Sequence, residues 1–103
     1  MIDNEPTNES AAEKIHNERE VLNIFEEIIG GDYEITKSVE DEAGLSALEV
    51  IAIDENGEKV GYNYRRTDFQ GETVIDVVFY DGDTPCGGYD LKEYKGGAWV
   101  DQA

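Results

Sequence analysis

The chain has 103 residues and carries 25 acidic against 8 basic side chains, a formal net charge of −17. A surface this negative repels bare nucleic acid and anionic membranes and attracts basic surfaces, which argues against direct binding to nucleic acid or membrane. Hydrophobic residues make up 39% of the chain, enough for the core of one small domain, and no apolar run approaches the length of a membrane span.

The first predicted element is an N-terminal amphipathic helix. Residues 1–9 are polar and are expected to form a flexible arm ahead of a single domain over residues 10–103. Ser10 and Glu13 have the spacing of a capping box, which predicts that the helix begins there. The glycine pair at 30–31 predicts its end. Between them, apolar residues recur at helical spacing: Ile15, Val21, Leu22, Phe25, Ile28 and Ile29.

The rest of the chain has the pattern of strands and turns. Apolar segments that alternate with polar residues or are rich in β-branched residues are bounded by charged or glycine-containing turns. The expected strands are Tyr33–Val39, Leu48–Ile53, Val60–Arg65, Thr73–Tyr80, Tyr89–Tyr94 and Ala98–Val100, with loops at 40–44 and 81–88. This order predicts an α+β fold in which the helix packs on a four- to six-stranded antiparallel meander sheet.

Asn56-Gly57 is a strong indication of a two-residue hairpin turn. Such a turn pairs Ile51 with Tyr62 and puts Gly61 on the opposite face, where its missing side chain leaves room for the helix. We therefore expect Tyr62 and Tyr64 to face away from the helix as an exposed aromatic surface. One helix cannot cover both faces of such a sheet, so the second face is solvated, forms a homodimer or binds a partner.

The outer face of the predicted helix carries a row of carboxylates. Glu13, Glu20 and Glu27 fall on one line, about 10 Å apart at 1.5 Å per residue, and His16 lies on the same polar side. Either this is a solvated helix face, or acids in the loops join it and a basic protein meets the array as it meets phosphates. The candidate partner-binding residues are Glu13, Glu20, Glu27, Glu40, Asp41, Glu42, Asp81 and Asp83.

The catalytic and metal-binding patterns in the sequence are all incomplete. Asp81-Gly82-Asp83 resembles the start of a calcium loop, but its twelfth position is Lys92 instead of a bidentate glutamate. Cys86 and His16 are the only thiol and imidazole, too few ligands for a structural zinc site, and the many carboxylates disfavour a reactive thiolate. We therefore expect no catalysis, no metal and no cofactor.

The composition leaves two functions open. The first is an acidic interaction module, an inhibitor that imitates nucleic acid and occupies the nucleic-acid-binding surface of a basic protein such as a nuclease; small counter-defence proteins often have this character. The alternative is a small soluble binding or accessory domain whose charge serves solubility or salt adaptation, without catalysis. A single cysteine and an N-terminus without the pattern of a secretory signal lead us to expect a cytoplasmic location.

Overall fold

The computed structural model describes residues 16–67 and 72–102. Helix α2 (Glu18–Ile29) begins after Asn17, whose side chain accepts a hydrogen bond from the Glu20 backbone N–H at 2.8 Å. In return, the Glu20 carboxylate accepts one from the Asn17 backbone N–H at 3.1 Å. This capping box satisfies two backbone donors that the first turn of a helix leaves without an intrahelical partner.

The start of the helix differs from the sequence prediction. Ser10 and Glu13 lie outside the described residues, but Asn17 has an extended backbone (φ −104°, ψ 169°), so a helix running unbroken from Ser10 to Ile29 is wrong. Asparagine side chains compete for backbone N–H groups, and this makes them better caps than interior residues. Gly30 ends α2 in the left-handed conformation (φ 69°), as the glycine pair predicts.

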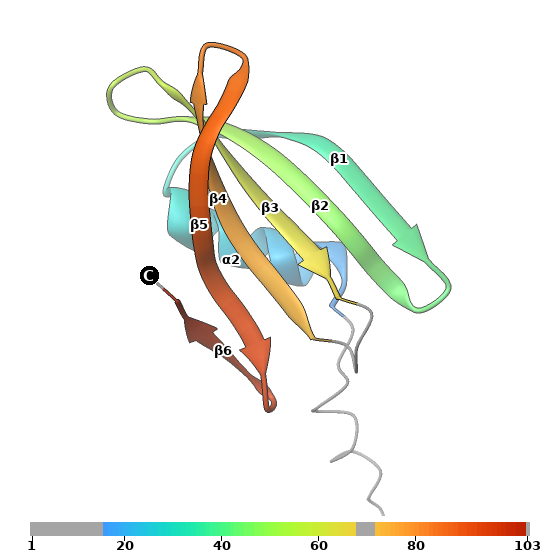
Figure 1. Cartoon of the computed structure of the whole chain (residues 1–103). Helices are drawn as coiled ribbons and strands as arrows, with labels where there is room; N and C mark the ends of the chain where they lie inside the picture. The colour runs from blue at the N-terminus through green and yellow to red at the C-terminus, as the bar shows by residue number, and fades with distance from the viewer. Residues whose placement is uncertain (1–15, 68–71, 103) are drawn as a thin grey trace, which may run out of the picture.

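Six antiparallel strands form one sheet in which each strand pairs with its neighbours in the sequence (Figure 1). The strands are β1 (Tyr33–Asp41), β2 (Gly44–Ile53), β3 (Lys59–Arg66), β4 (Thr73–Asp81), β5 (Thr84–Lys95) and β6 (Ala98–Asp101). Helix α2 lies across one face of this sheet. The predicted α+β fold, with an N-terminal helix on an antiparallel meander, is confirmed.

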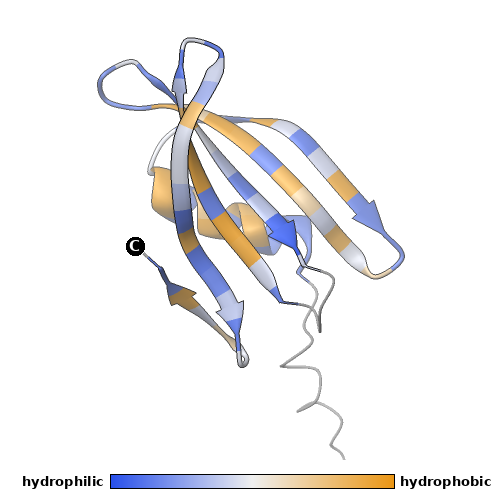
Figure 2. Ribbon diagram, viewed as in Figure 1, coloured by the Kyte–Doolittle hydropathy of each residue, from blue (hydrophilic) through white to orange (hydrophobic). Residues whose placement is uncertain are grey.

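The core lies between α2 and the sheet face that it covers. Val21, Leu22 and Phe25 are buried on one side of α2, because residues three and four apart share a helix face. The sheet contributes Leu45, Leu48, Val50, Tyr64 and Ile75 to the same cluster. Figure 2 shows apolar residues on α2 and the alternation of apolar and polar residues along the central strands. In the described part of the chain α2 is the one helix, so the opposite sheet face has no helical cover.

The β2–β3 hairpin has a three-residue loop instead of the predicted two-residue turn. The Asp54 N–H donates to Glu58 O at 2.9 Å, and the Gly57 N–H donates to Asp54 O at 3.0 Å. Gly57 takes the left-handed conformation (φ 81°) that closes such a loop. The extra residue in the loop shifts the β2–β3 register by one, so Tyr62 pairs with Val50 and not with Ile51 as predicted.

This shift reverses the predicted faces of β3, because a slip of one residue moves every side chain of a strand to the other face. Tyr64 lies on the helix side, is 0% exposed, and its hydroxyl donates to Leu45 O at 3.4 Å. Tyr62 also packs against the core, so the predicted exposed aromatic surface is wrong. Gly61 lies on the uncovered face, where an added Cβ would be 3.1 Å from the Tyr80 ring. The glycine thus makes room for Tyr80.

The predicted loops at 40–44 and 81–88 are largely strand. β1 reaches Asp41 and β2 begins at Gly44, while β5 begins at Thr84 directly after a two-residue turn. These segments are exposed and polar or glycine-rich, so hydropathy alone conceals their strand pairing. The tight turns put the β2–β3 and β4–β5 hairpins at one end of the sheet and the β1–β2 hairpin at the opposite end (Figure 1).

Candidate functional site

Every described lysine and arginine is paired with a carboxylate. The pairs are Arg19–Glu26, Lys37–Glu49, Lys59–Asp83, Arg65–Asp76, Arg66–Asp41, Lys92–Asp101 and Lys95–Glu93. Acidic side chains outnumber basic ones by 20 to 7 over residues 16–67 and 72–102. The positive charge of this part of the chain is therefore used within the molecule, and the excess that it presents to solvent is carboxylate.

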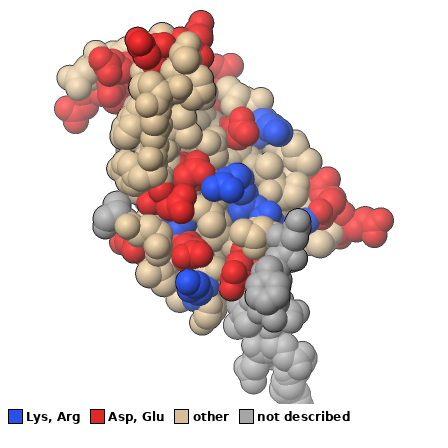
Figure 3. Space-filling view, viewed as in Figure 1, with Lys and Arg blue, Asp and Glu red and all other residues tan. Residues whose placement is uncertain are grey.

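Many carboxylates outside these ion pairs gather at one end of the sheet. They lie beside the start of β1, the end of β2, the start of β3 and the end of β4. The antiparallel order brings these strand ends together with the β2–β3 and β4–β5 hairpins (Figures 1 and 3). We call this surface the hairpin end; its acids are Asp32, Glu34, Asp54, Glu55, Glu58 and Asp81. None of these six forms an ion pair with a described lysine or arginine, so no described cation offsets them.

Ile53 is an exposed apolar side chain at the centre of the hairpin end. It is 62% exposed although it is the last residue of β2, next to Asp54. It lines the grooves on both sides of the β2–β3 hairpin. Protein interfaces combine an apolar centre with a polar rim, and Ile53 within its ring of carboxylates has that arrangement.

One of these grooves, of about 430 Å³, separates the end of α2 from the β2–β3 hairpin. It is lined by apolar or aromatic side chains that are buried or half-buried, Ile29, Ala52, Val60 and Tyr62, and by the exposed Asp54 and Glu55. The last turn of α2 contains no basic residue, so the partial negative charge of the helix C-terminus is not compensated there. This groove suits a lysine or arginine side chain, which has an apolar stem and a cationic head.

Lys59 occupies the other side of the hairpin end. Its ammonium lies 2.6 Å from the Asp83 carboxylate and 5.3 Å from the centre of the Tyr80 ring. The hydrogen bond with Asp83 raises the pKa of Lys59, and the same bond lowers the pKa of Asp83. Both groups therefore stay charged at neutral pH, and their charges offset each other. Of the two aspartates in the β4–β5 hairpin, Asp81 rather than Asp83 thus supplies net negative charge.

The predicted row of helix carboxylates is not a uniform array. Glu13 lies outside the described residues. Glu20 takes part in the capping box with Asn17, and its carboxylate is 3.8 Å from His16 Nδ1. Glu27 is exposed on α2. Of the two described members, one is thus engaged in local structure and the other faces solvent.

The predicted acidic loops are separated by the length of the sheet. Residues 40–42 belong to the β1–β2 hairpin, at the end of the sheet opposite to Asp81 and Asp83 (Figure 1). Asp41 is also bonded to Arg66, which holds the pKa of that carboxyl below its usual range. The eight predicted residues therefore do not form one contiguous surface, and the sequence prediction omitted most acids of the hairpin end.

His16 was expected on the polar side of the helix, and this expectation is wrong. It precedes the cap of α2 and is only 2% exposed. Its backbone O accepts a hydrogen bond from Leu45 N–H at 3.2 Å, which ties it to β2. Its ring lies 4.7 Å from Tyr94, 5.0 Å from Trp99 and 6.0 Å from Tyr64, measured between centroids.

The exposed aromatic pair of the described residues is Phe79 and Tyr89, which the sequence prediction missed. Their ring centroids are 5.9 Å apart, and the side chains are 43% and 48% exposed. They lie on the neighbouring strands β4 and β5, on the same face of the sheet as Val77. The sequence pattern correctly predicts the strands that contain Phe79 and Tyr89. It does not show where the helix lies on the sheet, and the position of the helix decides which aromatic residues remain uncovered.

The structure places Cys86 and His16, the only thiol and imidazole of the chain, far from each other. Cys86 is exposed near the start of β5, and His16 contacts Tyr94 near the end of the same strand. Cys86 and Tyr94 are eight residues apart, so at about 3.3 Å per residue Cys86 lies on the order of 25 Å from the position of His16. No group of three or more His, Cys, Asp or Glu within 16–67 and 72–102 is placed to hold a metal ion. No described helix has the length and apolarity needed to cross a membrane.

Comparison with protein-family models, curated proteins and solved structures finds no match to this chain. A function for this chain is therefore inferred from its own residues.

Proposed function

We propose that this protein is an acidic interaction module that binds a basic protein and occupies its nucleic-acid-binding surface as a nucleic-acid mimic. The observation that carries the proposal is the hairpin end, where six carboxylates outside the described ion pairs surround the exposed Ile53. Surfaces that bind nucleic acid present lysine and arginine to closely spaced negative charges. Because the described cations are all paired internally, Lys59 with Asp83 included, the hairpin end offers such a surface an excess of carboxylates.

The charge density of the hairpin end supports this proposal. Neighbouring strands lie about 4.8 Å apart, so the ends of four strands span roughly 14 Å. Six charges over that span correspond to about one per 2.5 Å, between the values for a single nucleic-acid strand, about one per 3.4 Å, and for a duplex, about one per 1.7 Å. Of the acids on α2, Glu26 is paired with Arg19 and Glu20 takes part in the capping box.

The test compares two variants with the same net charge. Glu55→Lys with Asp81→Lys changes the hairpin end, and Glu40→Lys with Glu42→Lys changes the opposite end of the sheet. A basic nucleic-acid-binding protein is captured from lysate on the immobilised chain, eluted with a salt gradient and purified. We expect stoichiometric, salt-weakened binding that competes with DNA or RNA. The hairpin-end variant should bind roughly tenfold more weakly, and the control variant should bind almost normally.

Three results would contradict the proposal. They are binding that ignores ionic strength, binding that leaves nucleic-acid binding by the partner intact, and an equal loss of affinity in both double variants. We further propose a cytoplasmic location, which the single exposed thiol of Cys86 supports because it needs no oxidising compartment.

A second candidate function is favoured by the acids that lie away from the hairpin end. Glu27 on α2 and Glu40 and Glu42 at the opposite end of the sheet spread the charge over the molecule (Figure 3). A spread charge suits a binding or accessory domain that uses it for solubility or salt adaptation. This alternative predicts strong stabilisation at molar salt and no competition with nucleic acid, so the same competition assay separates the two.

A further inference from the structure

Strand β5 has an open edge next to β6. One edge of β5 pairs with β4 along its whole length, while β6 covers the other edge only opposite Lys92–Lys95. The Gln102 N–H extends this cover by one bond, to Leu91 O at 2.9 Å. No strand in the described part of the chain pairs with the outer side of residues 86–90 (Figure 1). We call this segment, Cys86–Asp90, the open edge.

The backbone of the open edge presents hydrogen-bonding groups to solvent. Leu91 O points outward, toward Gln102, and backbone groups of alternate residues point to opposite edges of a strand. Followed through the β4–β5 register and its bulge, this alternation turns Tyr89 toward β4 and leaves the N–H and C=O groups of Gly88 and Asp90 on the outer edge. A second extended chain needs such a row of unpaired groups in order to add to a sheet.

The two outer strands of the sheet differ in how they are protected. Along β1, charged side chains at Glu34, Lys37 and Glu40 discourage pairing with another chain. The open edge of β5 instead reads Cys-Gly-Gly-Tyr-Asp, with a single charge at its end, and follows Pro85, which has no N–H to donate. The unprotected stretch is therefore short and bounded on both sides, which is typical of a specific pairing site.

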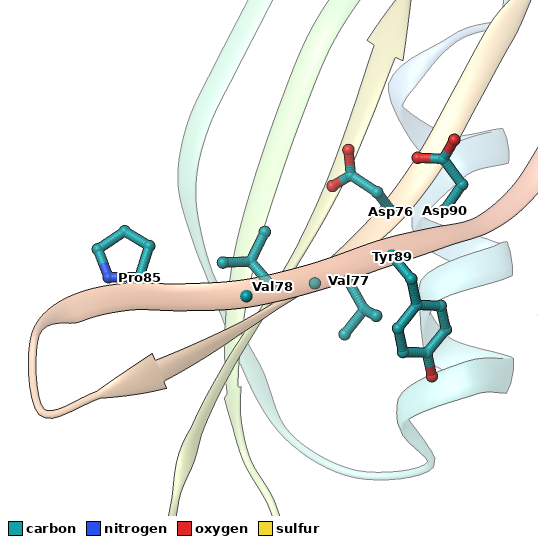
Figure 4. Close-up of a pocket in the computed structure, with 8 residues that line it drawn as sticks. Asp76, Val77, Val78, Pro85, Tyr89 and Asp90 are labelled. Atoms are coloured by element: carbon teal, nitrogen blue, oxygen red, sulfur yellow. The ribbon is translucent and has the colours of Figure 1, made fainter.

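The surroundings of the open edge specify the chemistry of an added strand. Gly87 and Gly88 line a hollow of about 350 Å³. Around this hollow, Asp76 and Asp90 project to one side of β5, while Val77 and Tyr89 project to the other (Figure 4). Asp76 is already bonded to Arg65 at 2.9 Å, but Asp90 forms no ion pair with a described residue. Alternate side chains of an added strand would thus meet a negative charge on one face and an aromatic ring on the other.

We propose that the open edge binds an extended segment of the basic partner as an added β-strand, with basic residues facing Asp90 and apolar residues facing Tyr89 and Phe79. The inference rests on the proposed function for the basic character of the partner. It adds a second contact, formed by the backbone, to the side-chain contacts at the hairpin end. Pairing with a second copy of this chain is disfavoured, because each copy carries a net charge of −17.

The test uses the full chain and a capped peptide of alternating lysine and valine, seven residues long. Its matched control has the same sequence with N-methyl groups on three consecutive central residues, which removes backbone donors from both edges and keeps the charge. We expect the unmodified peptide to bind about tenfold more tightly, because alternate N–H groups face the protein and the control therefore loses one or two hydrogen bonds. It should also slow the amide hydrogen exchange of Gly88 and Asp90.

Two charge reversals then locate the site. Asp90→Lys should weaken binding of the unmodified peptide about fivefold, whereas Glu27→Lys, an equal change of net charge on α2, should weaken it less than about twofold. Equal affinity for the two peptides overturns the inference, because it shows attraction by charge alone. Slowed exchange along β1 instead of β5 also overturns it, as does self-association of the chain that protects Gly88 and Asp90 without peptide.

The outcome is separable from that of the proposed function. If neither peptide binds while a basic protein still competes with nucleic acid for the chain, the open edge is not used and the mimic function stands. If the peptides are discriminated as expected but no competition with nucleic acid occurs, strand addition stands and the mimic function fails.

Discussion

The hydroxyl of Tyr64 lies in the core, where a charged phenolate would have little access to water. Burial raises the pKa of Tyr64 to about 12, and the nearby Arg66 opposes this increase only in part. An exposed tyrosine in the unfolded chain has a pKa near 10. The folded protein therefore holds this proton more tightly than the unfolded chain does, and folding becomes coupled to alkaline pH.

We predict that Tyr64 makes the protein lose roughly 2–3 kcal/mol of stability between pH 10 and pH 12. Below pH 10 the hydroxyl is protonated in both states, so its contribution is complete; above it, the unfolded chain ionises first and is favoured. Urea unfolding followed by circular dichroism at pH 9 to 12 measures this loss. Tyr64→Phe should reduce the loss, and an unchanged alkaline loss in this variant would contradict the prediction.

Among the elements, the β2–β3 hairpin shows where sequence patterns stop being sufficient. Asn56-Gly57 correctly predicts a turn, but the Asp54 carboxylate accepts hydrogen bonds from the N–H groups of Asn56 at 2.8 Å and Glu58 at 2.9 Å, and this stabilises a longer loop. Aspartate often orders turns in this way. A turn pattern thus predicts that a hairpin exists, whereas a side-chain contact sets its length, and one residue of length decides which face Tyr64 occupies.

We predict that Asp54→Ala lowers the free energy of unfolding by about 1–2 kcal/mol, because it removes two hydrogen bonds that order the loop. Glu55→Ala removes a neighbouring carboxylate that accepts no hydrogen bond in the described structure, so it should change stability by less than about 0.5 kcal/mol. Chemical denaturation of both variants measures the difference. Equal stabilities would show that the Asp54 contacts do not determine the loop.

Strand β5 offers a second prediction at the scale of elements. An added Cβ at Gly88 would lie 2.2 Å from the Val77 carbonyl oxygen, a backbone atom that cannot move aside freely. Gly57 has open space around it, and only its positive φ of 81° resists substitution. We therefore expect Gly88→Ala to cost about 3 kcal/mol or more and Gly57→Ala about 1 kcal/mol, as measured by thermal unfolding. The reverse order would contradict the close approach of β5 to β4.

For the whole molecule, the sequence predicts the architecture better than the surface. The helix followed by neighbouring strands suffices to derive the meander, because short turns force each strand to pair with the preceding one. The grouping of the acids depends on the number of strands between two turns. The first turn and the fourth turn lie at opposite ends of a meander, so residues 40–42 cannot join Asp81. The three strands predicted between residues 40–44 and 81–88 already imply this separation, whereas the pairing of individual carboxylates with lysine or arginine depends on side-chain contacts that the sequence does not show.

We predict that added salt stabilises the whole molecule. The net charge of −17 repels itself, and the described cations are already engaged in ion pairs, so dissolved cations must provide the screening. Between 20 and 500 mM NaCl, the midpoint of thermal unfolding should rise by roughly 5 °C, equivalent to about 1 kcal/mol. A midpoint that is constant or falls would contradict the prediction. A continued steep rise into molar salt would favour salt adaptation.

The meander order of the strands also has a kinetic consequence. Strands that pair are consecutive in the sequence, so each hairpin closes a short loop and loses little chain entropy before its contacts form. Sheets built from distant segments fold slowly because they must close long loops first. This chain can instead assemble hairpin by hairpin, and we expect it to fold within milliseconds. The least local contacts are those of His16, just before α2, with Tyr94 on β5 and Trp99 on β6, so docking of this N-terminal segment is the step that completes the core.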